Sequence, residues 1–447
     1  MKRQEEQFPR LVGKVRGQAE RIRDAFAASG PKGANGPAIV IVHDEEGGIA
    51  YMYAEYQLLV RDEYLERVQV RLGQPTDRSK VTRIIEGIVH LALERAKNPK
   101  IKALRGETPT VRAACQAIDE EFGEGIVTPN HVLTVAPVGP CPATEPQEVY
   151  DQIEPYPGIC TENSGEGVLV YIGDTGLLED HAVDHPWLAG DVRRGRDPDG
   201  NIQPWETTRQ ADPAGGVQKI PEYTGHGTFV AGVVRCMAPK AELIVANIFK
   251  IAGSTLEDRL VRQLRHALGL GVDIFHLSIT APTRQDIPLA AFERWLNLIH
   301  RQYEGTVCVV AAGNDGGRRP VWPAALPQTV SVGALAADWR NRASFSNYGS
   351  WVNVYAPGRD LINAFATGPY RCQDDPYRGE VRNFYGMAKW SGTSFSTPIV
   401  TGLIAARIWR TGESGQQAAA ALLAEARSQA IPGTGPILLP CGNRNGT

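Results

Sequence analysis

Three glycine-flanked segments of the chain hold side chains that could carry out nucleophilic catalysis. Asp174 lies in Gly-Asp-Thr-Gly, His226 in Gly-His-Gly-Thr and Ser394 in Gly-Thr-Ser-Phe-Ser-Thr-Pro. A serine hydroxyl is a poor nucleophile at neutral pH, so it needs an imidazole to take its proton and a carboxylate to hold that imidazole in the right tautomer. These residue types predict Ser394 as the nucleophile, His226 as the general base and Asp174 as the group that orients the base.

Each segment has an ordinary structural explanation when it is taken alone. Asp-Thr-Gly occurs often in turns and is also the signature of aspartic proteases, although no second Asp-Thr-Gly follows here. His226 by itself would be a turn or core histidine, and Ser394 a residue chosen to cap a helix. The conjunction of the segments in one order, at domain-sized separations, favours the catalytic interpretation.

The order Asp, His, Ser is that of the subtilisin arrangement and differs from the chymotrypsin order and from hydrolases with a G-x-S-x-G elbow. A further segment, Ala311-Ala312-Gly313-Asn314, follows an apolar strand expected over 305–310. On these motifs the chain resembles the subtilisin-like serine proteases (subtilases, peptidase family S8). The resemblance implies a serine endopeptidase that forms an acyl-enzyme, with the Asn314 side chain and the Ser394 backbone N–H holding the oxyanion.

The resemblance also assigns the pocket for the substrate side chain before the scissile bond. One wall would be Leu277, Ser278 and Ile279, the other Ala311, Ala312 and Gly313, with Val321 at the base. The main chain of the first wall would pair with an extended protein or peptide substrate. Relatives usually have a glycine soon after that serine, and Ile279-Thr280 in its place could narrow the cleft. Val321 favours small or medium apolar groups, whereas Asp315 at the rim would instead attract Lys or Arg.

The hydrophobic pattern predicts an α/β fold for most of the chain. Apolar strands alternate with helical stretches between about 160 and 430, which is typical of a mostly parallel sheet flanked by helices, with reactive groups at the carboxyl ends of the strands. The resemblance implies the subtilisin-like three-layer form of this fold. The expected strands are 168–172, 243–249, 273–279 and 306–311, and the expected helices 230–237, 256–270, 291–302 and 394–410.

Proline distribution suggests how the chain is divided. We expect an N-terminal α+β domain over 1–135, a proline-rich linker over 136–159, a catalytic domain over 160–431 and a C-terminal tail over 432–447. The N-terminal domain matches no family in its residues. Its pattern predicts a helix over 1–28, strands over 37–43, 50–60 and 64–72, and a helix from Thr108-Pro109 to Phe122.

The role of the N-terminal domain has two interpretations. In subtilisin relatives an α+β region at this place is commonly a propeptide, which assists folding and inhibits until it is cleaved. A permanent regulatory domain, or one that binds a regulatory partner, fits its greater length equally well.

Two departures from the family pattern lead to further expectations. Many relatives bind calcium in a loop after His226, but residues 233–239 close that interval without a carboxylate, and calcium needs six to eight oxygen ligands. We therefore expect no metal and no cofactor. Insertions over 193–222 and 367–389 are polar and rich in glycine or proline, so we expect surface loops. The second could gate or recognise substrate, whereas the first is expected to be decorative.

Composition agrees with a globular enzyme. Of 447 residues, 42% are hydrophobic and 22% charged, and the net charge of −3 gives no sign of nucleic-acid binding. No apolar run of eighteen residues could cross a membrane, and residues 1–23 lack the apolar region of a secretory signal. Seven scattered cysteines without a C-x-x-C pair argue against a zinc site. We expect a cytoplasmic protein with reduced cysteines.

Three other classes of protein share part of this pattern. An inactive binding module could keep the fold, but such proteins usually lose a member of the triad. An acidic-pH serine-carboxyl peptidase would have Glu and Asp where this chain has His226 and Asn314. An esterase with the same triad would not need the peptide-pairing strand over 277–279.

Overall fold

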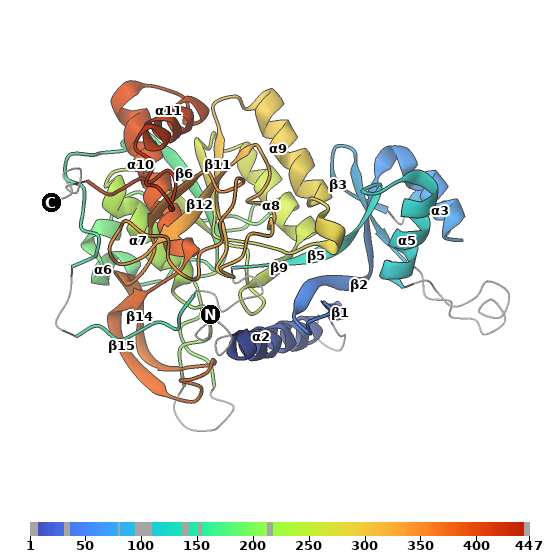
Figure 1. The fold of residues 1–447 in the computed structure, drawn as a ribbon, viewed down its shortest axis with the longest axis horizontal. Coiled ribbons are helices and arrows are strands. Elements are labelled where there is room, and N and C mark those ends of the chain that lie inside the picture. The colour runs from blue at the N-terminus through green and yellow to red at the C-terminus, as the bar shows by residue number, and fades with distance from the viewer. Residues whose placement is uncertain are drawn as a thin grey trace.

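A seven-stranded parallel sheet forms the centre of the larger half of the molecule (Figure 1). The computed structural model describes residues 8–30, 36–78, 81–93, 110–135, 143–150, 154–211 and 218–441, without the side chains of 8–16. The strand order is β13-β12-β11-β10-β6-β8-β7, and every neighbouring pair is parallel. The strands are β6 (Leu169–Asp174), β7 (Val192–Arg194), β8 (Glu242–Asn247), β10 (Ile274–Leu277), β11 (Val307–Ala311), β12 (Thr329–Leu335) and β13 (Val354–Pro357).

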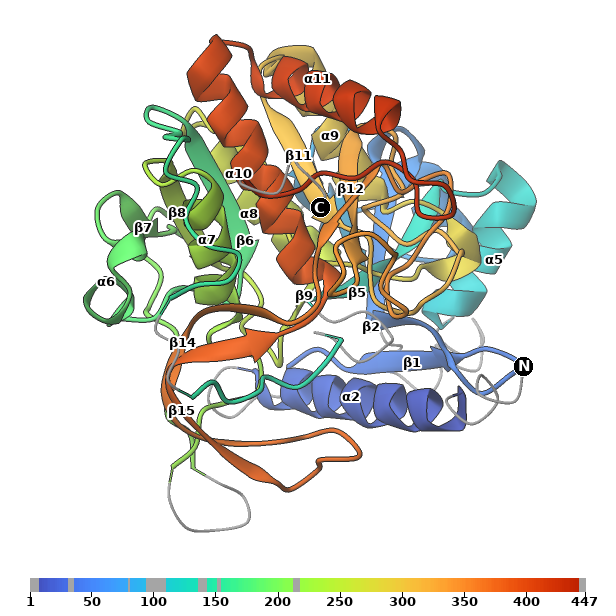
Figure 2. The same ribbon diagram turned by 60° about the vertical axis from the view of Figure 1, so that its left-hand side comes forward.

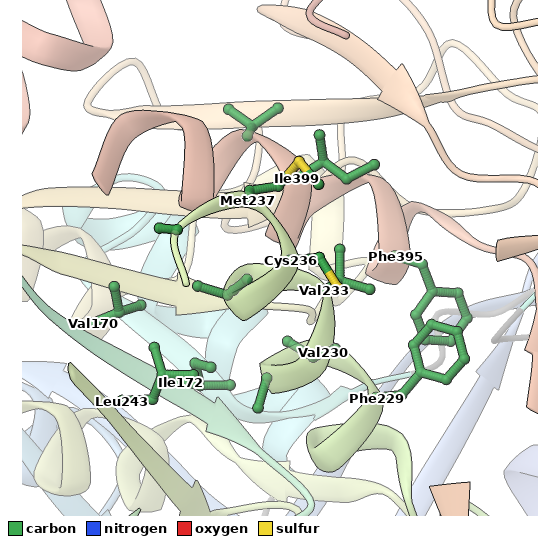
Figure 3. Close-up of a cluster of buried hydrophobic side chains, with 14 of the residues drawn as sticks. Val170, Ile172, Phe229, Val230, Val233, Cys236, Met237, Leu243, Phe395 and Ile399 are labelled. Atoms are coloured by element: carbon green, nitrogen blue, oxygen red, sulfur yellow. The ribbon is translucent and has the colours of Figure 1, made fainter. Parts of the chain in front are cut away.

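Helices cover both faces of this sheet, which confirms the predicted three-layer α/β fold. One face carries α7 (His226–Met237) and α10 (Thr393–Thr411), with α11 (Gly415–Ser428) packed on α10; the other carries α8 (Glu257–Leu268) and α9 (Ala290–Gln302). Side chains of β6 alternate between the two layers, as the period of a strand requires. Val170 and Ile172 belong to one apolar cluster with residues of α7 and α10 such as Val230 (Figure 3), whereas Tyr171 packs with Phe275 on the other side.

The regular spacing of apolar residues explains why the helices of this half were predictable. In α9 the buried residues Phe292, Trp295, Leu296 and Ile299 recur at helical intervals and form one stripe facing the sheet.

Connections between these elements include the short helix α6 (His181–Asp184) and 3-10 turns over Pro186–Leu188 and Arg284–Asp286.

The N-terminal region forms a second, antiparallel sheet with helices, which agrees with the predicted α+β pattern and which one strand of the catalytic half, β9 (Ser254–Leu256), joins. Its strands follow the order β3-β4-β2-β5. Strand β4 pairs with residues 57–61 of β2, and β1 pairs with residues 49–54 of β2. The elements are α2 (Phe8–Ala28), β1 (Ile39–His43), β2 (Ile49–Arg61), the 3-10 turn Asp62–Tyr64, α3 (Leu65–Arg71), β3 (Val81–Ile85), β4 (Ile88–Ala92), α5 (Val111–Phe122) and β5 (Val127–Thr134).

The prediction of a strand over 64–72 is wrong, because these residues form helix α3. Leu65 and Val68, three residues apart, are buried together, while Val70 is 68% exposed. The β-branched valines suggested a strand, but helical spacing of the buried residues decides the outcome. Helix α5 begins at Val111 with the Thr110 side chain as its cap. The cap predicted at 108–109 lies outside the described residues, as do the first seven residues of the helix predicted over 1–28.

The second insertion is a long β-hairpin, so the expectation of a surface loop over 367–389 is wrong. Strand β14 (Leu361–Arg371) pairs with β15 (Val381–Trp390) in an antiparallel sheet of two strands. Alternate residues of β15, among them Arg382 and Phe384, are buried. Tyr385, which lies between the buried residues Phe384 and Gly386, is 74% exposed. Glycines and prolines in the sequence concealed this period-2 pattern.

Parts of the proline-rich segment over 136–159 are firmly packed along this hairpin. Gln147 bridges to Lys389 and Tyr156 to Ile362 through paired backbone hydrogen bonds. The carboxylate of Glu145 accepts hydrogen bonds from the backbone N–H groups of residues 373 and 374. Residues 136–142 and 151–153 lie outside the described part of the chain.

Two cysteines are joined, contrary to the expectation that all would be reduced. Cys160, at the start of the catalytic half, forms a disulfide with Cys441. Folding brings them together although 281 residues separate them in sequence, so the spacing gave no sign of the pair. The bond ties the C-terminal segment to this half of the molecule, where Leu438 also donates to the Tyr355 carbonyl.

Candidate active site

Four of the predicted site residues meet at the carboxyl edge of the parallel sheet. Asp174 is the last residue of β6, His226 the first residue of α7, and Asn314 follows the end of β11 by three residues. Ser394 is the second residue of α10. In such sheets, ligands bind beyond the carboxyl ends of the strands, at the topological switch point where the strand order reverses.

Asp174 and His226 form a buried pair. His226 Nδ1 donates to Asp174 Oδ1 at 2.7 Å, and both side chains are fully buried. The Thr175 backbone N–H donates to the same oxygen at 2.7 Å. Because a carboxylate only accepts, the proton resides on Nδ1 and Nε2 is left as an acceptor. Among the described residues His226 Nε2 has no hydrogen-bond partner, so its lone pair is available to a hydroxyl proton.

Packing around the imidazole brings it to the start of α10. The rings of His226 and Phe395, the residue after Ser394, have centroids 5.3 Å apart, and Trp390 lies 5.7 Å from His226. Phe229, one turn along α7, packs on Phe395 with a centroid distance of 4.5 Å, as Figure 3 shows. The aromatic group therefore fixes the general-base candidate beside the turn that carries the nucleophile candidate.

A glycine is required where α7 approaches the end of β6. A Cβ on Gly227 would lie 2.3 Å from the Gly176 carbonyl oxygen and 3.3 Å from the Asp174 Cβ. Real Cβ atoms essentially never come within 3.0 Å of another heavy atom. The glycine after His226 therefore permits the close approach on which the Asp–His hydrogen bond depends.

Asn314 is oriented by the first residue of α10. Its Oδ1 accepts from the Thr393 backbone N–H at 2.8 Å and from the Thr393 hydroxyl at 2.9 Å. A backbone N–H can only donate, so the amide oxygen is assigned and the Nδ2 group points away from Thr393. First-turn N–H groups of a helix lack partners within that helix, so the Ser394 N–H can act beside Nδ2 on a developing oxyanion.

His276, which the sequence did not single out, lies beneath the nucleophile. Its Nε2 contacts the Ser278 hydroxyl at 3.0 Å, and that hydroxyl donates to the Ser394 carbonyl at 3.1 Å. The Ser278 hydroxyl has one proton, so His276 Nε2 donates to it, and Nδ1 lies 2.9 Å from the Thr401 hydroxyl, which also contacts the Thr397 carbonyl at 3.1 Å. Burial lowers the pKa of His276 to about 3, so the ring stays neutral. The sequence signal that could have singled out His276 is its place within the apolar strand β10.

The predicted pocket walls are adjacent and buried. β10 and β11 pair with Leu277 opposite Val310, so the wall over 277–279 lies beside the wall over 311–313. Gly313 has a φ of +95°, and a Cβ there would lie 2.7 Å from Asn347 Nδ2 and 3.4 Å from Thr280 Cγ2. The Thr280 side chain thus lies against Gly313 of the second predicted wall.

The structure places Val321 in the core next to the first predicted wall and Asp315 beside Asn347. Val321 is 5% exposed, and its neighbour Trp322 exchanges backbone hydrogen bonds of 2.6 and 3.1 Å with Ala281, just after the first wall. The Asp315 carboxylate accepts from Asn347 Nδ2 at 3.1 Å. The contact with Asn347 occupies part of the hydrogen-bonding capacity of that carboxylate.

A strand of the N-terminal region pairs with the residue directly after the first predicted pocket wall. Thr134 and Thr280 exchange two backbone hydrogen bonds, of 3.1 and 3.0 Å, and the Val135 N–H donates to the Gly253 carbonyl at 2.9 Å. On its other edge β5 pairs antiparallel with β9 (Ser254–Leu256) of the catalytic half. Figure 1 shows β5 leaving the N-terminal region to reach β9, and Ser394 is only 1% exposed.

Helix α2 is attached near the same site by ion pairs. Arg21 makes a bidentate contact with Glu222, at 3.0 and 2.8 Å, and a further one with Asp374 at 3.3 Å. Glu222 lies four residues before His226, and Asp374 lies between the hairpin strands, so α2 touches both. Figure 2 shows α2 lying beneath β1 and beside the hairpin. Neither contact carried a sequence signal.

The first insertion is partly buried, so the expectation that it is decorative is wrong. Gln203 is 3% exposed, accepts from the Asn247 N–H at 2.7 Å and donates to the Asn247 carbonyl at 3.3 Å. The Thr224 hydroxyl donates to the Thr207 carbonyl at 2.9 Å. Residues 203–207 therefore lie between the end of β8 and the loop before His226.

Neither a metal-binding cluster nor a membrane-spanning helix occurs among the described residues. Within them, no group of three or more His, Cys, Asp or Glu side chains could hold a metal ion. The described helices also include none with the length and hydropathy needed to span a bilayer.

This fold and this site geometry are those of a serine peptidase. The family model for the Subtilase family (peptidase S8) matches residues 165–432, more than half of the chain. The chain therefore belongs to this family and is a subtilisin-like serine endopeptidase.

Known relatives agree with this membership. The chain is 28% identical over 264 residues to the intracellular serine protease of Paenibacillus polymyxa, which covers 56% of this chain and 69% of that protein. It is 29% identical over 244 residues to the thermophilic serine proteinase of Bacillus sp. (strain AK1), covering 54% of this chain and about half, 52%, of that protein.

Fervidolysin from Fervidobacterium pennivorans, a keratinolytic enzyme related to subtilisin, has a similar fold, with a TM-score of 0.56 and 20% sequence identity. That likeness covers 87% of this chain and 60% of fervidolysin.

Proposed function

We propose that this endopeptidase cleaves peptide bonds with Asp174, His226 and Ser394 as its catalytic triad and acts as an intracellular processing or regulatory protease. The observation that carries the triad assignment is the 2.7 Å hydrogen bond between His226 Nδ1 and buried Asp174, which leaves Nε2 as an acceptor beside the start of α10. Such a pair can take a proton from a hydroxyl and stabilise the resulting imidazolium.

The proposed reaction proceeds in two stages. Ser394 Oγ attacks the peptide carbonyl while His226 Nε2 takes its proton, and Asn314 Nδ2 with the Ser394 N–H stabilises the oxyanion. His226 then protonates the leaving amine, which leaves an acyl-enzyme on Ser394. Water attacks this ester with His226 again as the base, and the released acid restores the hydroxyl.

Labelling with a fluorophosphonate tests the proposed nucleophile. We expect a probe attached to Ser394, identified by mass spectrometry of the digested protein, and no label in Ser394→Ala. Ser396→Ala is the matched control, because Ser396 lies in the same helical turn and its hydroxyl is bonded to the Thr393 carbonyl at 3.0 Å. Labelling of Ser394→Ala at the wild-type rate would contradict the assignment. Comparing the rates of hydrolysis of casein and of a small ester separates a peptidase from an esterase.

We also propose that the N-terminal region inhibits the full chain. The proposal is supported by the pairing of Thr134 with Thr280, because a substrate strand would need the same edge. Mass spectrometry during incubation distinguishes the two forms of inhibition. A fragment beginning after about residue 135 together with rising activity indicates a propeptide, whereas an intact chain with constant low activity indicates a permanent regulatory domain that a partner must displace.

Cytoplasmic location is proposed from the likeness to an intracellular relative. The Cys160–Cys441 bond opposes this proposal, because disulfides persist mainly in oxidising compartments. Cells can be fractionated after their thiols are blocked with an alkylating agent. The cytoplasmic proposal requires that the protein is recovered in the soluble cytoplasmic fraction. There Cys160 and Cys441 are either both alkylated or joined by a disulfide that forms despite that compartment. Recovery only from an exported fraction would refute the proposal.

A further inference from the structure

Glu206, in the first insertion, is buried behind the Asp174–His226 pair. Its Oε2 accepts a hydrogen bond from the Gly225 backbone N–H at 2.9 Å, and its own N–H donates to the Leu177 carbonyl at 2.9 Å. The Thr175 side chain is hydrogen-bonded to the same carboxyl group. One carboxyl therefore contacts the residue directly after Asp174 and the residue directly before His226.

The Thr175 hydroxyl connects this carboxyl to both members of the pair. Thr175 Oγ1 accepts from the Gly227 N–H at 3.1 Å, so its own proton is available to donate to Glu206. The Thr175 N–H meanwhile donates to Asp174 Oδ1, the oxygen that binds His226. A short network thus joins Glu206 to the loop after β6 and to the first turn of α7.

The ionisation of Glu206 falls in the range where a serine peptidase operates. Burial raises the pKa of its carboxyl to about 8, and the negative charge of Asp174 adds to this rise, whereas the Thr175 and Gly225 hydrogen bonds oppose it. Asp174 at the end of β6 is the ionisable group that acts on it through charge, and His226 follows directly after Gly225, whose N–H the carboxyl binds. Glu206 therefore changes from neutral to charged between about pH 7 and pH 9.

We propose that Glu206 is a positioning residue for the acid–base pair: its carboxyl group holds the loops of Asp174 and His226 at one spacing and, when charged, further stabilises the His226 imidazolium. The inference rests on the proposed roles of Asp174 and His226. No bond is made or broken by Glu206, which acts through hydrogen bonds and charge alone. A negative charge close to a buried imidazolium favours the protonated form.

Nuclear magnetic resonance of the full chain tests this inference without turnover. The Nδ1 proton and the ring ¹⁵N signals of His226, assigned with His226→Gln in [¹⁵N]histidine-labelled protein, are followed from pH 5 to pH 10. Wild type is expected to show an inflection near pH 8 in these signals that comes from Glu206. Glu206→Gln, which keeps the size and one hydrogen bond, is expected to lose the inflection near pH 8, and Glu206→Asp to restore one.

The rate of fluorophosphonate labelling gives a second readout. The rate for Glu206→Gln should be about tenfold below wild type at pH 9 and within about twofold of it at pH 6, where Glu206 is neutral in wild type. Glu145→Gln is the matched control, because Glu145 is also a buried carboxyl with a raised pKa but binds the hairpin loop. Its signals and rates should follow wild type.

Two outcomes would overturn the inference. An inflection near pH 8 that persists in Glu206→Gln, or its absence from wild type, would show that Glu206 charge does not reach His226. A loss of labelling that is equal at pH 6 and pH 9 would indicate a structural effect alone. Failure of the proposed triad itself would be recognised separately, since Ser394→Ala would then still be labelled.

Discussion

Thr134 and Thr280 each donate a backbone hydrogen bond to the other, at 3.1 and 3.0 Å, at the edge of the first predicted pocket wall. The two residues belong to the N-terminal region and to the wall of the predicted pocket. Strand β9 closes the other edge of β5, so the inserted segment is paired on both sides. The fold thus holds β5 between the residue after the first predicted pocket wall and β9.

Loosening this strand is expected to raise the activity of the full chain. Leu133 is fully buried among residues of the catalytic half, including Tyr223 and Leu277, so Leu133→Glu would bury a carboxylate and favour release of the strand. We expect hydrolysis of a short peptide to rise by about tenfold or more, because the burial cost exceeds 1.4 kcal/mol. Val70→Glu makes the same change at a position that is 68% exposed and should leave the rate unchanged. Equal rates for both variants would argue against inhibition by β5.

Removing the Asn314 donor is expected to lower kcat while KM stays nearly constant. Loss of one oxyanion donor costs about 10²–10³ in kcat. Asn314→Asp is the sharper variant, because it keeps the acceptor for Thr393 and removes the Nδ2 donor. Thr393→Val removes one of the two bonds that orient the amide and should cost only about fivefold. Steady-state kinetics checks both, and a rise in KM with unchanged kcat would contradict the role.

The free energy of unfolding should decrease as the pH falls below 6.5, because of His276. Burial lowers the pKa of His276 to about 3, whereas the unfolded chain takes up the proton near the ordinary value of 6.5. Between these values the unfolded state binds more protons, so the free energy of unfolding decreases by up to about 1.4 kcal/mol for each unit that the pH falls below 6.5. Above pH 6.5 both states are neutral and the effect vanishes.

Urea unfolding of the inactive Ser394→Ala form at pH 7 and pH 4.5 measures this contribution. His276→Gln keeps a donor and an acceptor but does not titrate, so its loss of stability between the two pH values should be smaller by about 2–3 kcal/mol. His43→Gln replaces an exposed histidine of β1 and should follow wild type. An unchanged pH dependence in His276→Gln would refute the prediction.

Counting thiols tests the disulfide. The chain has seven cysteines, and the Cys160–Cys441 bond removes two from reaction. Protein denatured without reductant should therefore give about five reactive thiols per chain, rising to about seven after reduction. Replacing Cys441 by Ser should lower the free energy of unfolding by about 2–5 kcal/mol under oxidising conditions. Seven thiols without reductant would show that the bond does not form in solution.

The regular elements of the catalytic half were predictable because their burial follows a period. Strands over 168–172 and 306–311 and the helix over 291–302 appear as β6, β11 and α9 within two residues of the predicted ends. The error over 64–72 arose where valines favoured a strand but long-range packing selected a helix. The hairpin over 361–390 escaped prediction because glycines and prolines interrupt its alternation.

The amino-acid sequence by itself determined which chemistry is available, since the residue types and order of Asp174, His226 and Ser394, with Asn314, are local properties of four motifs. Only the tertiary structure decided which other groups surround them. Glu206, His276 and Thr134 reach the site through contacts between distant segments, and a pKa near 8 or 3 arises from removal of water by all the elements that enclose the group. The burial of a single polar group such as Glu206 or His276 depends on every element that encloses it, so the residues around it in sequence do not report its pKa.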